Sequence, residues 1–367
     1  MSIDLSYSPA SERAKKIVKD AIVIDSLNCI ALFRGPGWAD READAELVYG
    51  YLERAREAGV TAMSATVGFD PERSSQTLSR ITGWLDAISR FPDRYILVRN
   101  TADIRQAHAS GRLGIYFTNQ GACCFDEDPN LVGLYRRLGV GYCLLAYNNR
   151  YRAGDGAYEP DDAGLTAWGR DLVKAMSRYG MPLDISHTGI RASREALELL
   201  RETAPDKPPI YSHTGLKRHV DHTRAATDEN ARTLAAAGGV MNINLCNPVI
   251  TGNPTTEMKP ADCAAAIDTA VQFAGIDHVG IATDDFEDMA PFIAFVRDKH
   301  DKYPDGGRSI QIVLDGKNRF AELAKTLPAI VDCLLEKDYS ENDVQKVIGG
   351  NMMRVLEATW DKGICSA

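Results

Sequence analysis

The sequence predicts an α/β fold, specifically a (β/α)8 TIM-like barrel, for this chain of 367 residues. Short apolar runs alternate with amphipathic segments along most of the chain, which is the pattern of repeated β–α–β units with a parallel sheet. There is one more apolar run than a closed eight-stranded barrel needs, and the length lies within the range of such barrels. These observations together favour a barrel over an open sheet.

The predicted strands are apolar runs rich in Val, Ile and aromatic residues, whereas the predicted helices carry apolar residues at helical spacing and several end in Gly. We expect strands at 21–27, 60–67, 95–100, 113–121, 140–147, 181–187, 208–213, 238–245 and 278–284. We expect helices at 43–59, 164–180, 190–202 and 261–275. Since no internal repeat or linker-like segment is present, residues 1–367 are predicted to form a single barrel domain. A loop at about 285–316 should lie over the barrel mouth, and a helical tail should end the chain.

Composition excludes several classes of partner. The net charge is −9 and no basic run occurs, which argues against binding to nucleic acid or to an anionic membrane. No apolar run approaches the roughly 20 residues of a membrane span, and the first residues lack the pattern of a signal peptide. We therefore expect a cytoplasmic protein whose eight scattered cysteines are reduced thiols.

Polar residues with chemical capability end five of the predicted strands: Gln120, Tyr147, His187, His213 and Asp284. Barrel enzymes gather their catalytic groups at the carboxyl ends of the strands, so these side chains should converge. A single histidine at a strand end is usually structural. Two of them, in "LDISH" and "IYSH" on successive strands, favour a pair of ligands, because two imidazoles and a carboxylate commonly hold catalytic zinc.

Four segments carry a family resemblance: "MPLDISHTG", "PPIYSHTG", "HVGIATDDFE" and "GGNMMRVLE". Together with "LGVGYCLLAYNNRYRAGDGAYEPDDAGL" they resemble the membrane (renal) dipeptidase family, and in particular its bacterial branch. The resemblance runs from Asp25 to Arg354 in the order of the family. It implies an amidohydrolase-like barrel, zinc-dependent metallopeptidase activity on dipeptides, and a homodimer.

The resemblance also assigns metal ligands, and here the chain departs from the family. His187 and His213 match the two ligand histidines, Asp284 matches the last aspartate and Asp25 the leading one. The three remaining ligand positions hold Leu27, Cys29 and Gln120. Two divalent ions about 3.5–4 Å apart repel by on the order of 20 kcal/mol at an effective dielectric of 20, so they need carboxylates around and between them. Because these three positions provide no carboxylate, a two-zinc centre is not expected.

The expected cofactor is therefore one zinc ion, with a metal-free site as the alternative. His187, His213 and Asp284 are the predicted ligands, and Cys29 and Gln120 are further candidates. Cys29 has three possible roles. It is a thiolate ligand for a soft metal, a small apolar filler of the vacated space, or a nucleophile activated by a neighbouring histidine.

The resemblance further implies residues that contact the substrate. Tyr147 stands where eukaryotic members place a histidine that contacts the substrate carbonyl, and a phenol can donate a hydrogen bond to an oxyanion. Arg224 corresponds to the arginine that grips the substrate carboxylate, for which a guanidinium is well suited. Asn148 follows Tyr147 and is a candidate for substrate binding.

Three hypotheses for function follow. The first is a dipeptidase-like metallohydrolase acting on a small amide with a free carboxylate. In it, Asp284 accepts a proton from the attacking water and Tyr147 stabilises the oxyanion. The second is a barrel of the same family recruited to other chemistry on a small metabolite. The third is a non-catalytic protein that binds a small carboxylate, which the retention of His187, His213 and Arg224 together disfavours.

Overall fold

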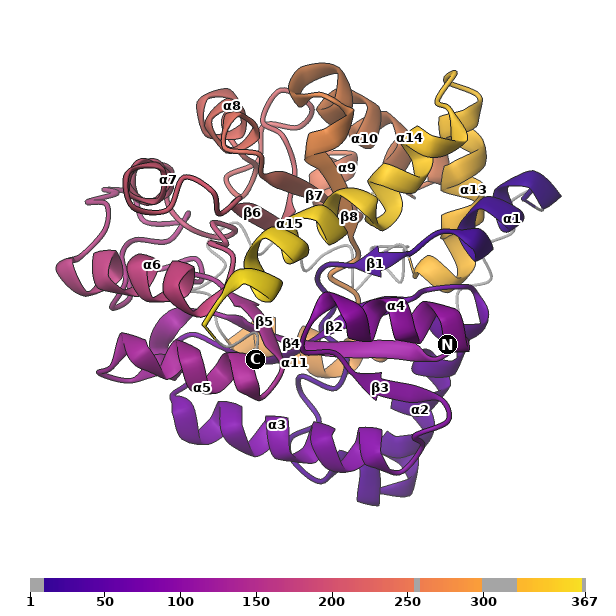
Figure 1. Cartoon of the computed structure of the whole chain (residues 1–367), viewed down its shortest axis with the longest axis horizontal. Coiled ribbons are helices and arrows are strands. Elements are labelled where there is room, and N and C mark those ends of the chain that lie inside the picture. Colours follow the sequence, from indigo (N-terminus) through magenta and orange to yellow (C-terminus); the bar gives the residue numbers. More distant parts are fainter. Residues whose placement is uncertain (1–9, 254–257, 299–321, 365–367) are drawn as a thin grey trace.

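The computed structural model describes residues 10–253, 258–298 and 322–364. Its strands are all parallel and short, and most of their side chains are buried (Figure 1). They are β1 (Ile24–Asp25), β2 (Ala62–Phe69), β3 (Tyr95–Leu97), β4 (Leu113–Gln120), β5 (Val140–Cys143), β6 (Ile210–Thr214), β7 (Val240–Asn244) and β8 (Val279–Ala282). Eight of the nine predicted strands are thereby confirmed.

The strands form two sheets that single backbone contacts link into a ring. One sheet contains β1, β2 and β4, with both β3 and β5 paired to β4, and the other has the order β6–β7–β8. Parallel bridges from Asp184 to Leu144 and to Ile210 join the sheets on one side. On the other side, Ser26 N donates to Ile281 O at 3.3 Å. Since β3 pairs only with the first residues of β4, it is the additional strand.

The predicted strand at 181–187 is wrong. Residues 181–187 continue the ring, but only Asp184 forms bridges with neighbouring strands. The side chain of Asp184 accepts hydrogen bonds from backbone N–H groups that would otherwise pair with a neighbouring strand. The Asp184 carboxylate accepts hydrogen bonds from Ser186 N and Ser212 N, both at 3.0 Å. His187 then turns into the left-handed region at φ 58°, which ends any extended run.

Helices alternate with the strands and cover the outside of the ring (Figure 1). They are α1 (Glu12–Asp20), α2 (Glu42–Glu57), α3 (Ser74–Ser89), α4 (Thr101–Ser110), α5 (Val132–Arg137), α6 (Ala167–Tyr179), α7 (Ile190–Thr203), α8 (Asp228–Ala236), α9 (Asn247–Ile250), α10 (Pro260–Ala274), α11 (Met289–Asp298), α13 (Leu323–Leu335), α14 (Glu341–Gln345) and α15 (Asn351–Thr359). The four predicted helices agree with α2, α6, α7 and α10 to within a few residues.

Helix α6 ends at Gly180, where the backbone is left-handed with φ 76°. A Cβ at this position would lie 2.6 Å from Thr359 O and 2.8 Å from Gly363 Cα. Gly180→Ala should therefore lower the free energy of unfolding by roughly 2–4 kcal/mol, measured by urea denaturation, because backbone strain and a clash with backbone atoms add.

Gly111 is the matched control for this prediction. It ends α4 at a similar φ of 66°, but a Cβ there would meet nothing within 4 Å. Gly111→Ala should cost only about 1 kcal/mol, from the left-handed backbone alone. Equal losses for the two variants would contradict the steric argument.

The C-terminal helices cover the amino ends of the strands. Trp360 Nε1 donates to Gly141 O at 2.9 Å, at the start of β5. Asn351 Nδ2 donates to Val279 O at 2.8 Å, at the start of β8, and Arg354 reaches Gly238 O at 2.7 Å, ahead of β7. Helix α13 packs beside α1, where Ser11 N donates to Asp332 Oδ2 at 2.6 Å. The predicted helical tail thus closes one end of the barrel.

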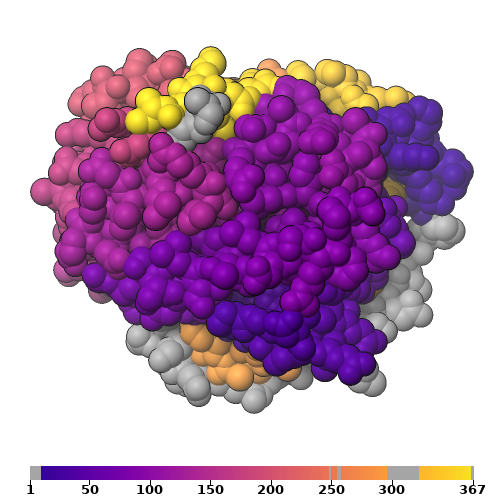
Figure 2. All heavy atoms as spheres, turned by 60° about the horizontal axis from the view of Figure 1, so that its bottom comes forward, coloured from indigo at the N-terminus to yellow at the C-terminus, as the bar shows by residue number. Residues whose placement is uncertain are grey.

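Helix α11 lies at the opposite end from this tail. The predicted loop at about 285–316 is helical over Met289–Asp298, and residues 299–316 fall outside the described part. In Figure 2 the orange segment that includes α11 and the yellow C-terminal helices emerge on opposite sides of the molecule. The carboxyl ends of the strands, where the predicted site residues lie, are therefore not covered by the tail.

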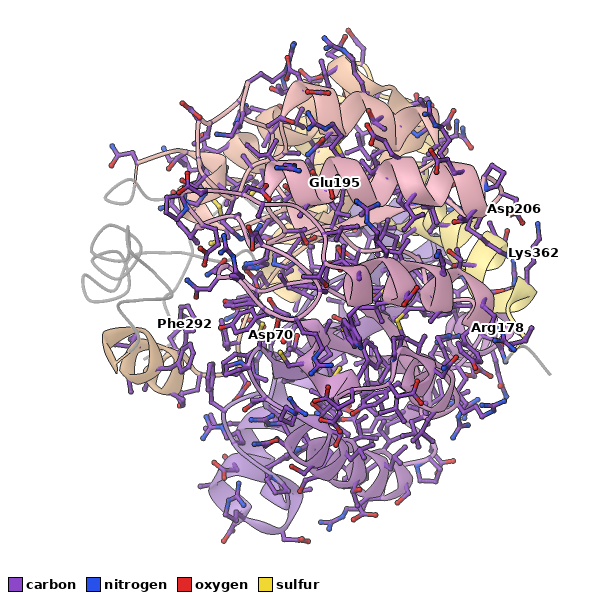
Figure 3. All side chains as sticks on the ribbon, turned by 90° about the vertical axis from the view of Figure 1, so that its left-hand side faces the viewer. Asp70, Arg178, Glu195, Asp206, Phe292 and Lys362 are labelled. Atoms are coloured by element: carbon purple, nitrogen blue, oxygen red, sulfur yellow. The ribbon has the colours of Figure 1, made fainter. Side chains whose placement is uncertain are left out.

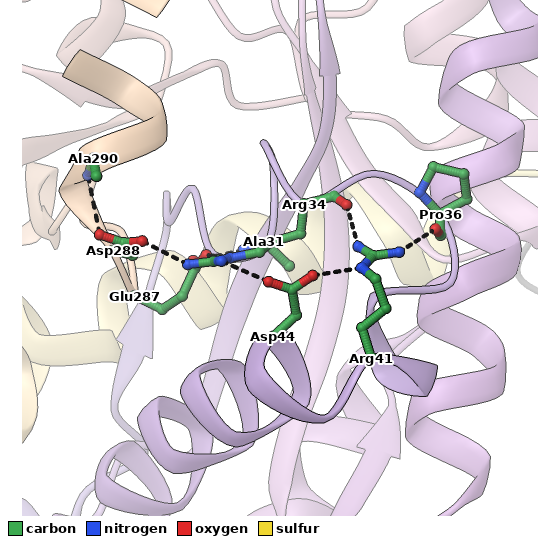
Figure 4. A network of polar contacts seen from close by, with 8 residues as sticks. All are labelled: Ala31, Arg34, Pro36, Arg41, Asp44, Glu287, Asp288 and Ala290. Carbon is green, nitrogen blue, oxygen red and sulfur yellow. Dashed lines mark hydrogen bonds and ion pairs between the residues drawn. The ribbon is translucent and has the colours of Figure 1, made fainter. Parts of the chain in front are cut away.

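A buried cation ties the segments after β1 and β8 together. Arg34 contacts three carboxylates, from Asp44 at 2.6 Å, Glu287 at 2.8 Å and Asp288 at 2.8 Å (Figure 4). Its side chain is only 11% exposed. Since three carboxylates share one well-buried guanidinium, this contact holds the rim of the barrel in place.

No disulfide is formed by the seven cysteines within the described residues, which agrees with the expectation of reduced thiols. Among the residues whose structure is described, no helix combines the length and apolar character needed to cross a bilayer.

Candidate functional site

The predicted site residues meet at the carboxyl ends of the strands. Gln120 is the last residue of β4, His213 lies in β6, and Asp284 follows β8. Two backbone hydrogen bonds join the segments after β1 and β8: Asp284 N donates to Leu27 O at 2.8 Å, and Cys29 N donates to Asp285 O at 2.9 Å. These bonds place Cys29 and Asp284 side by side.

Asp284 is held by a chain of polar contacts. Cys29 Sγ donates to Asp284 Oδ1 at 3.4 Å, and Gln120 Nε2 donates to the same sulfur at 3.2 Å. Asn244 Nδ2 donates to Asp284 Oδ2 at 3.2 Å. The four groups form one connected chain in which the carboxylate is the final acceptor.

Burial sets the protonation of this chain. It raises the pKa of the Asp284 carboxyl to about 6, and the hydrogen bond from Cys29 and the charge of Arg224 oppose that shift. Burial and the neighbouring Asp284 carboxylate raise the pKa of the Cys29 thiol well above its ordinary value. At neutral pH the pair is therefore a carboxylate beside a protonated thiol, which is not an activated nucleophile.

A second chain runs through the two histidines. Asn148 Oδ1 accepts a hydrogen bond from His187 Nδ1 at 2.6 Å, and His187 Nε2 lies 2.8 Å from His213 Nε2. Arg224 Nη2 lies 3.0 Å from His213 Nε2. Because a guanidinium can only donate, His213 Nε2 is the acceptor and its ring proton is on Nδ1. That proton is directed at Ser212 Oγ, 3.0 Å away.

Both imidazoles are neutral in this arrangement. Burial lowers the pKa of His187 and of His213 well below the ordinary value, and the positive charge of Arg224 adds to the effect. Because Asn148 Oδ1 can only accept, the proton of neutral His187 is on Nδ1, and its unprotonated Nε2 faces His213 Nε2. Arg224 is therefore the donor to His213 Nε2.

Tyr147 connects the histidines to a group of aromatic side chains. Its ring stacks on His187 with centroids 4.1 Å apart and lies 6.1 Å from Phe69. Phe69 is in turn 6.1 Å from Phe33, which contacts Phe292 at 6.3 Å. Phe292 points from α11 toward the body of the barrel (Figure 3). An aromatic surface therefore extends from the histidines to α11.

Three site residues have left-handed backbone conformations although none is glycine: Asn148 at φ 65°, His187 at φ 58° and Asp284 at φ 55°. Each costs roughly 1–2 kcal/mol for a residue with a side chain. Such strain persists where surrounding contacts impose it, and it is common at functional sites. The polar contacts described above hold all three side chains.

The donor set does not fit the zinc ion that the family resemblance implies. Two imidazole nitrogens on one tetrahedral zinc lie about 3.4 Å apart, given Zn–N bonds of about 2.1 Å. The 2.8 Å between His187 Nε2 and His213 Nε2 is clearly shorter than this separation. Within the described residues, no three His, Cys, Asp or Glu side chains are placed to hold one ion. A divalent ion about 4 Å from the Arg224 charge would also be repelled by roughly 8 kcal/mol at a dielectric of 20.

Sequence reasoning missed two residues that complete the site. Asn244 is the last residue of β7 and contacts Asp284, and the rule that selected the other strand ends could have selected it too. Ser212 fixes the proton of His213, but no sequence signal distinguishes it from any buried serine.

Comparisons with known proteins agree with this architecture. A family model described as "Membrane dipeptidase (Peptidase family M19)" matches residues 11–305. The dipeptidase verJ of Clonostachys rogersoniana is 26% identical to this chain, over 94% of this chain and 86% of its own length. The dipeptidase aclJ of Aspergillus oryzae is also 26% identical, over 73% of this chain and 57% of its own length.

Solved structures share the fold. An amidohydrolase from Pseudomonas aeruginosa superposes with a TM-score of 0.79 at 29% identity, covering 95% of this chain and 99% of its own. A metallopeptidase from Rhodobacter sphaeroides, solved with a phosphinate mimic of the dipeptide L-Ala-D-Ala, gives a TM-score of 0.74 at 20% identity. That match covers 93% of this chain and 100% of the other. The parallel ring is thus the TIM-type barrel of the amidohydrolase-like enzymes.

Proposed function

The chain belongs to the membrane dipeptidase family of hydrolases, and from that premise we propose that it hydrolyses a small amide, such as a dipeptide, that carries a free carboxylate. Arg224 is the observation that carries this proposal. Its guanidinium is partly buried, and within the described residues no carboxylate lies within 4 Å of it. A charge held in this way favours an anionic ligand, and a guanidinium matches a carboxylate in geometry.

Asn244 supports an amide or amine as the other part of the substrate. Its Nδ2 is used by Asp284, whereas its buried Oδ1 has no hydrogen-bond partner in the described part of the chain. An unpaired buried acceptor costs free energy, which a substrate N–H would recover. Arg224 and Asn244 together therefore suit a molecule with a carboxylate and an N–H group.

The reaction follows from the charges at the site. Asp284, a carboxylate above about pH 6, takes a proton from water as the water oxygen attacks the carbonyl carbon. Tyr147 donates a hydrogen bond to the oxyanion. When the C–N bond breaks, the leaving nitrogen receives the proton from Asp284, and the products are a carboxylic acid and an amine.

Whether the reaction requires a metal ion is a separate part of the proposal. One zinc ion on His187, His213 and Asp284, with Cys29 and Gln120 nearby, is what the family resemblance implies. The described contacts of these side chains do not fit such an ion, and the proton transfers of the proposed reaction are made by side chains alone. A homodimer and a cytoplasmic location remain predictions from the resemblance and the composition.

The aromatic surface suggests an apolar substituent on the substrate. Phe69 and Phe33 are only partly buried although they belong to an apolar cluster with Cys29, Leu32 and Phe286. Exposed aromatic rings beside a polar site commonly contact a ligand. We therefore expect dipeptides with large apolar side chains to be preferred over Gly- or Asp-containing ones.

Replacing Arg224 tests the proposal. On an accepted dipeptide, Arg224→Met should lower kcat/KM by about 10²-fold, because a charge-assisted pair with the substrate carboxylate is lost. The same variant should match the wild-type protein on the corresponding C-terminal amide, which has no carboxylate. Both are measured by amine release.

Arg218→Met provides the control. Arg218 lies in the same segment but is exposed and pairs with Asp228 at 2.6 Å. Its replacement should change kcat/KM less than twofold. A loss for Arg224→Met that is equally large on the amide substrate would contradict carboxylate recognition.

A second candidate function is favoured by Leu27, Cys29 and Gln120, which stand where the resemblance expects metal ligands. This candidate is other chemistry on a carboxylate-bearing metabolite in the same barrel. It would be supported if a broad dipeptide panel gave no hydrolysis while a small apolar carboxylate still bound in an Arg224-dependent manner, measured by calorimetry.

A further inference from the structure

Both ring nitrogens of His213 already make hydrogen bonds within the protein. Its ring proton is directed at Ser212 Oγ at 3.0 Å, and Nε2 accepts from Arg224 Nη2 at 3.0 Å. A neutral imidazole has one lone pair in the ring plane, and it is this lone pair that binds a metal. His213 therefore cannot bind an ion until Arg224 moves away.

The neighbouring chain of hydrogen bonds around Asp284 is also made by groups of the protein. The Asp284 carboxylate accepts from Cys29 and from Asn244, and Gln120 donates to the Cys29 sulfur. Leu27 is buried and contributes only its backbone oxygen, to Asp284 N. Among the buried side-chain atoms of Cys29, Gln120, Asn244 and Asp284, which the structure describes, only Asn244 Oδ1 lacks a hydrogen-bond partner.

Arg224 supplies the positive charge between the two chains. Its Nη2 is 3.0 Å from His213, and its charge opposes the rise in the pKa of Asp284. A guanidinium is permanently charged, is attached to the chain, and carries half the charge of a divalent ion, so it requires fewer carboxylates around it. The amide of Gln120 and the apolar side chain of Leu27, at positions where the resemblance expects metal ligands, suit such a cation.

We propose that the Arg224 guanidinium takes the place of a metal ion in this site, as a resident cation that caps the lone pair of His213. The protein then contains no bound divalent metal in its working state. This inference concerns the contents of the site and does not depend on which substrate is accepted.

Metal content tests it directly. Protein purified without chelator or added metal should hold less than about 0.1 equivalent of Zn, Mn, Fe, Co or Ni by mass spectrometry. Titration with Zn²⁺ against a chromophoric chelator should show no site at the micromolar level. Retention of one or two equivalents after dialysis would overturn the proposal.

Arg224 variants test the role of the guanidinium. Arg224→Ala releases the lone pair of His213, so the variant should bind Zn²⁺ at least tenfold more tightly than the wild-type protein. With Co²⁺ it should give an absorption band in the visible range. Adding His213→Ala to Arg224→Ala should abolish both signals. Arg224→Lys, which keeps a cation near Nε2, should behave like the wild-type protein.

The variants also separate this proposal from the proposed function. Thermal unfolding must show that each variant is folded, and the metal measurements on the wild-type protein stand even if a variant is not. If Arg224→Ala binds Zn²⁺ no more tightly than the wild-type protein, the capping role is wrong, whatever the activity. If the wild-type protein is metal-free but hydrolyses no amide, only the proposed reaction fails.

Discussion

Asp284→Asn should lower kcat on an accepted amide by about 10³-fold while KM changes only a few-fold. Asn has nearly the same shape and can still contact Cys29 and Asn244, but it cannot accept a proton from water. General-base catalysis of this kind contributes about 10²–10⁴-fold. Initial rates of amine release at saturating substrate measure the effect.

The pH profile of the same variant distinguishes proton transfer from a structural effect. Because burial raises the pKa of Asp284 to about 6, the active carboxylate form is lost as the pH falls through that value. The kcat/KM of the wild-type protein should thus rise between pH 5 and 7, and this rise should be absent in Asp284→Asn.

Asp285→Asn is the neighbouring control. Asp285 is buried, accepts a hydrogen bond from Tyr51 at 2.9 Å, and has a pKa raised by burial to about 7. It does not contact the histidine chain within the described structure. Its replacement should reduce kcat by less than tenfold and keep the rise near pH 6. A rise near pH 6 that survives in Asp284→Asn would assign the base to another group.

Arg34→Met should lower the free energy of unfolding by roughly 3–5 kcal/mol, measured by urea denaturation at pH 7. Removing the cation takes from Glu287 and Asp288 the guanidinium that they share and leaves Asp44 with Arg41 alone, and breaking a buried pair typically costs this much.

Arg41→Met is the control in the same network (Figure 4). Arg41 contacts Asp44 at 2.6 Å from the solvent side, and its side chain is 48% exposed. Exposed pairs contribute less than about 1 kcal/mol, so this variant should be close to the wild-type protein in stability. Similar losses for Arg34 and Arg41 would show that burial does not decide the strength of this network.

Periodicity was sufficient to predict the strands that make ladders and the long amphipathic helices. It failed at 181–187, because there the Asp184 side chain accepts the backbone hydrogen bonds that a strand would make. The pattern of apolar residues does not reveal such side-chain hydrogen bonds. It also missed that the segment after β8 becomes helix α11, whose apolar residues pack on the aromatic surface rather than on the main core. Local pattern cannot show which surface a helix will meet.

The candidate site shows the same limit. Strand-end position was enough to bring His187, His213 and Asp284 to one end of the barrel. The close approach of the two histidines and the contact of Arg224 with His213 depend on side-chain orientation, and His187 reaches its place through a left-handed backbone. Residue type and spacing do not encode these features, so the expected zinc ligands could be named but not their actual partners.

The position of the C-terminal helices has a consequence for how the protein forms in the cell. Trp360, Asn351 and Arg354 satisfy backbone oxygens at the amino ends of β5, β8 and β7, and α13 packs against α1. Helix α1 and the amino ends of these strands therefore receive their partners from segments far along the sequence. Contacts of such long sequence separation slow folding and leave apolar surface exposed meanwhile. A nascent chain halted before residue 340 would lack the contacts of Trp360, Asn351 and Arg354, so its barrel could not be completed.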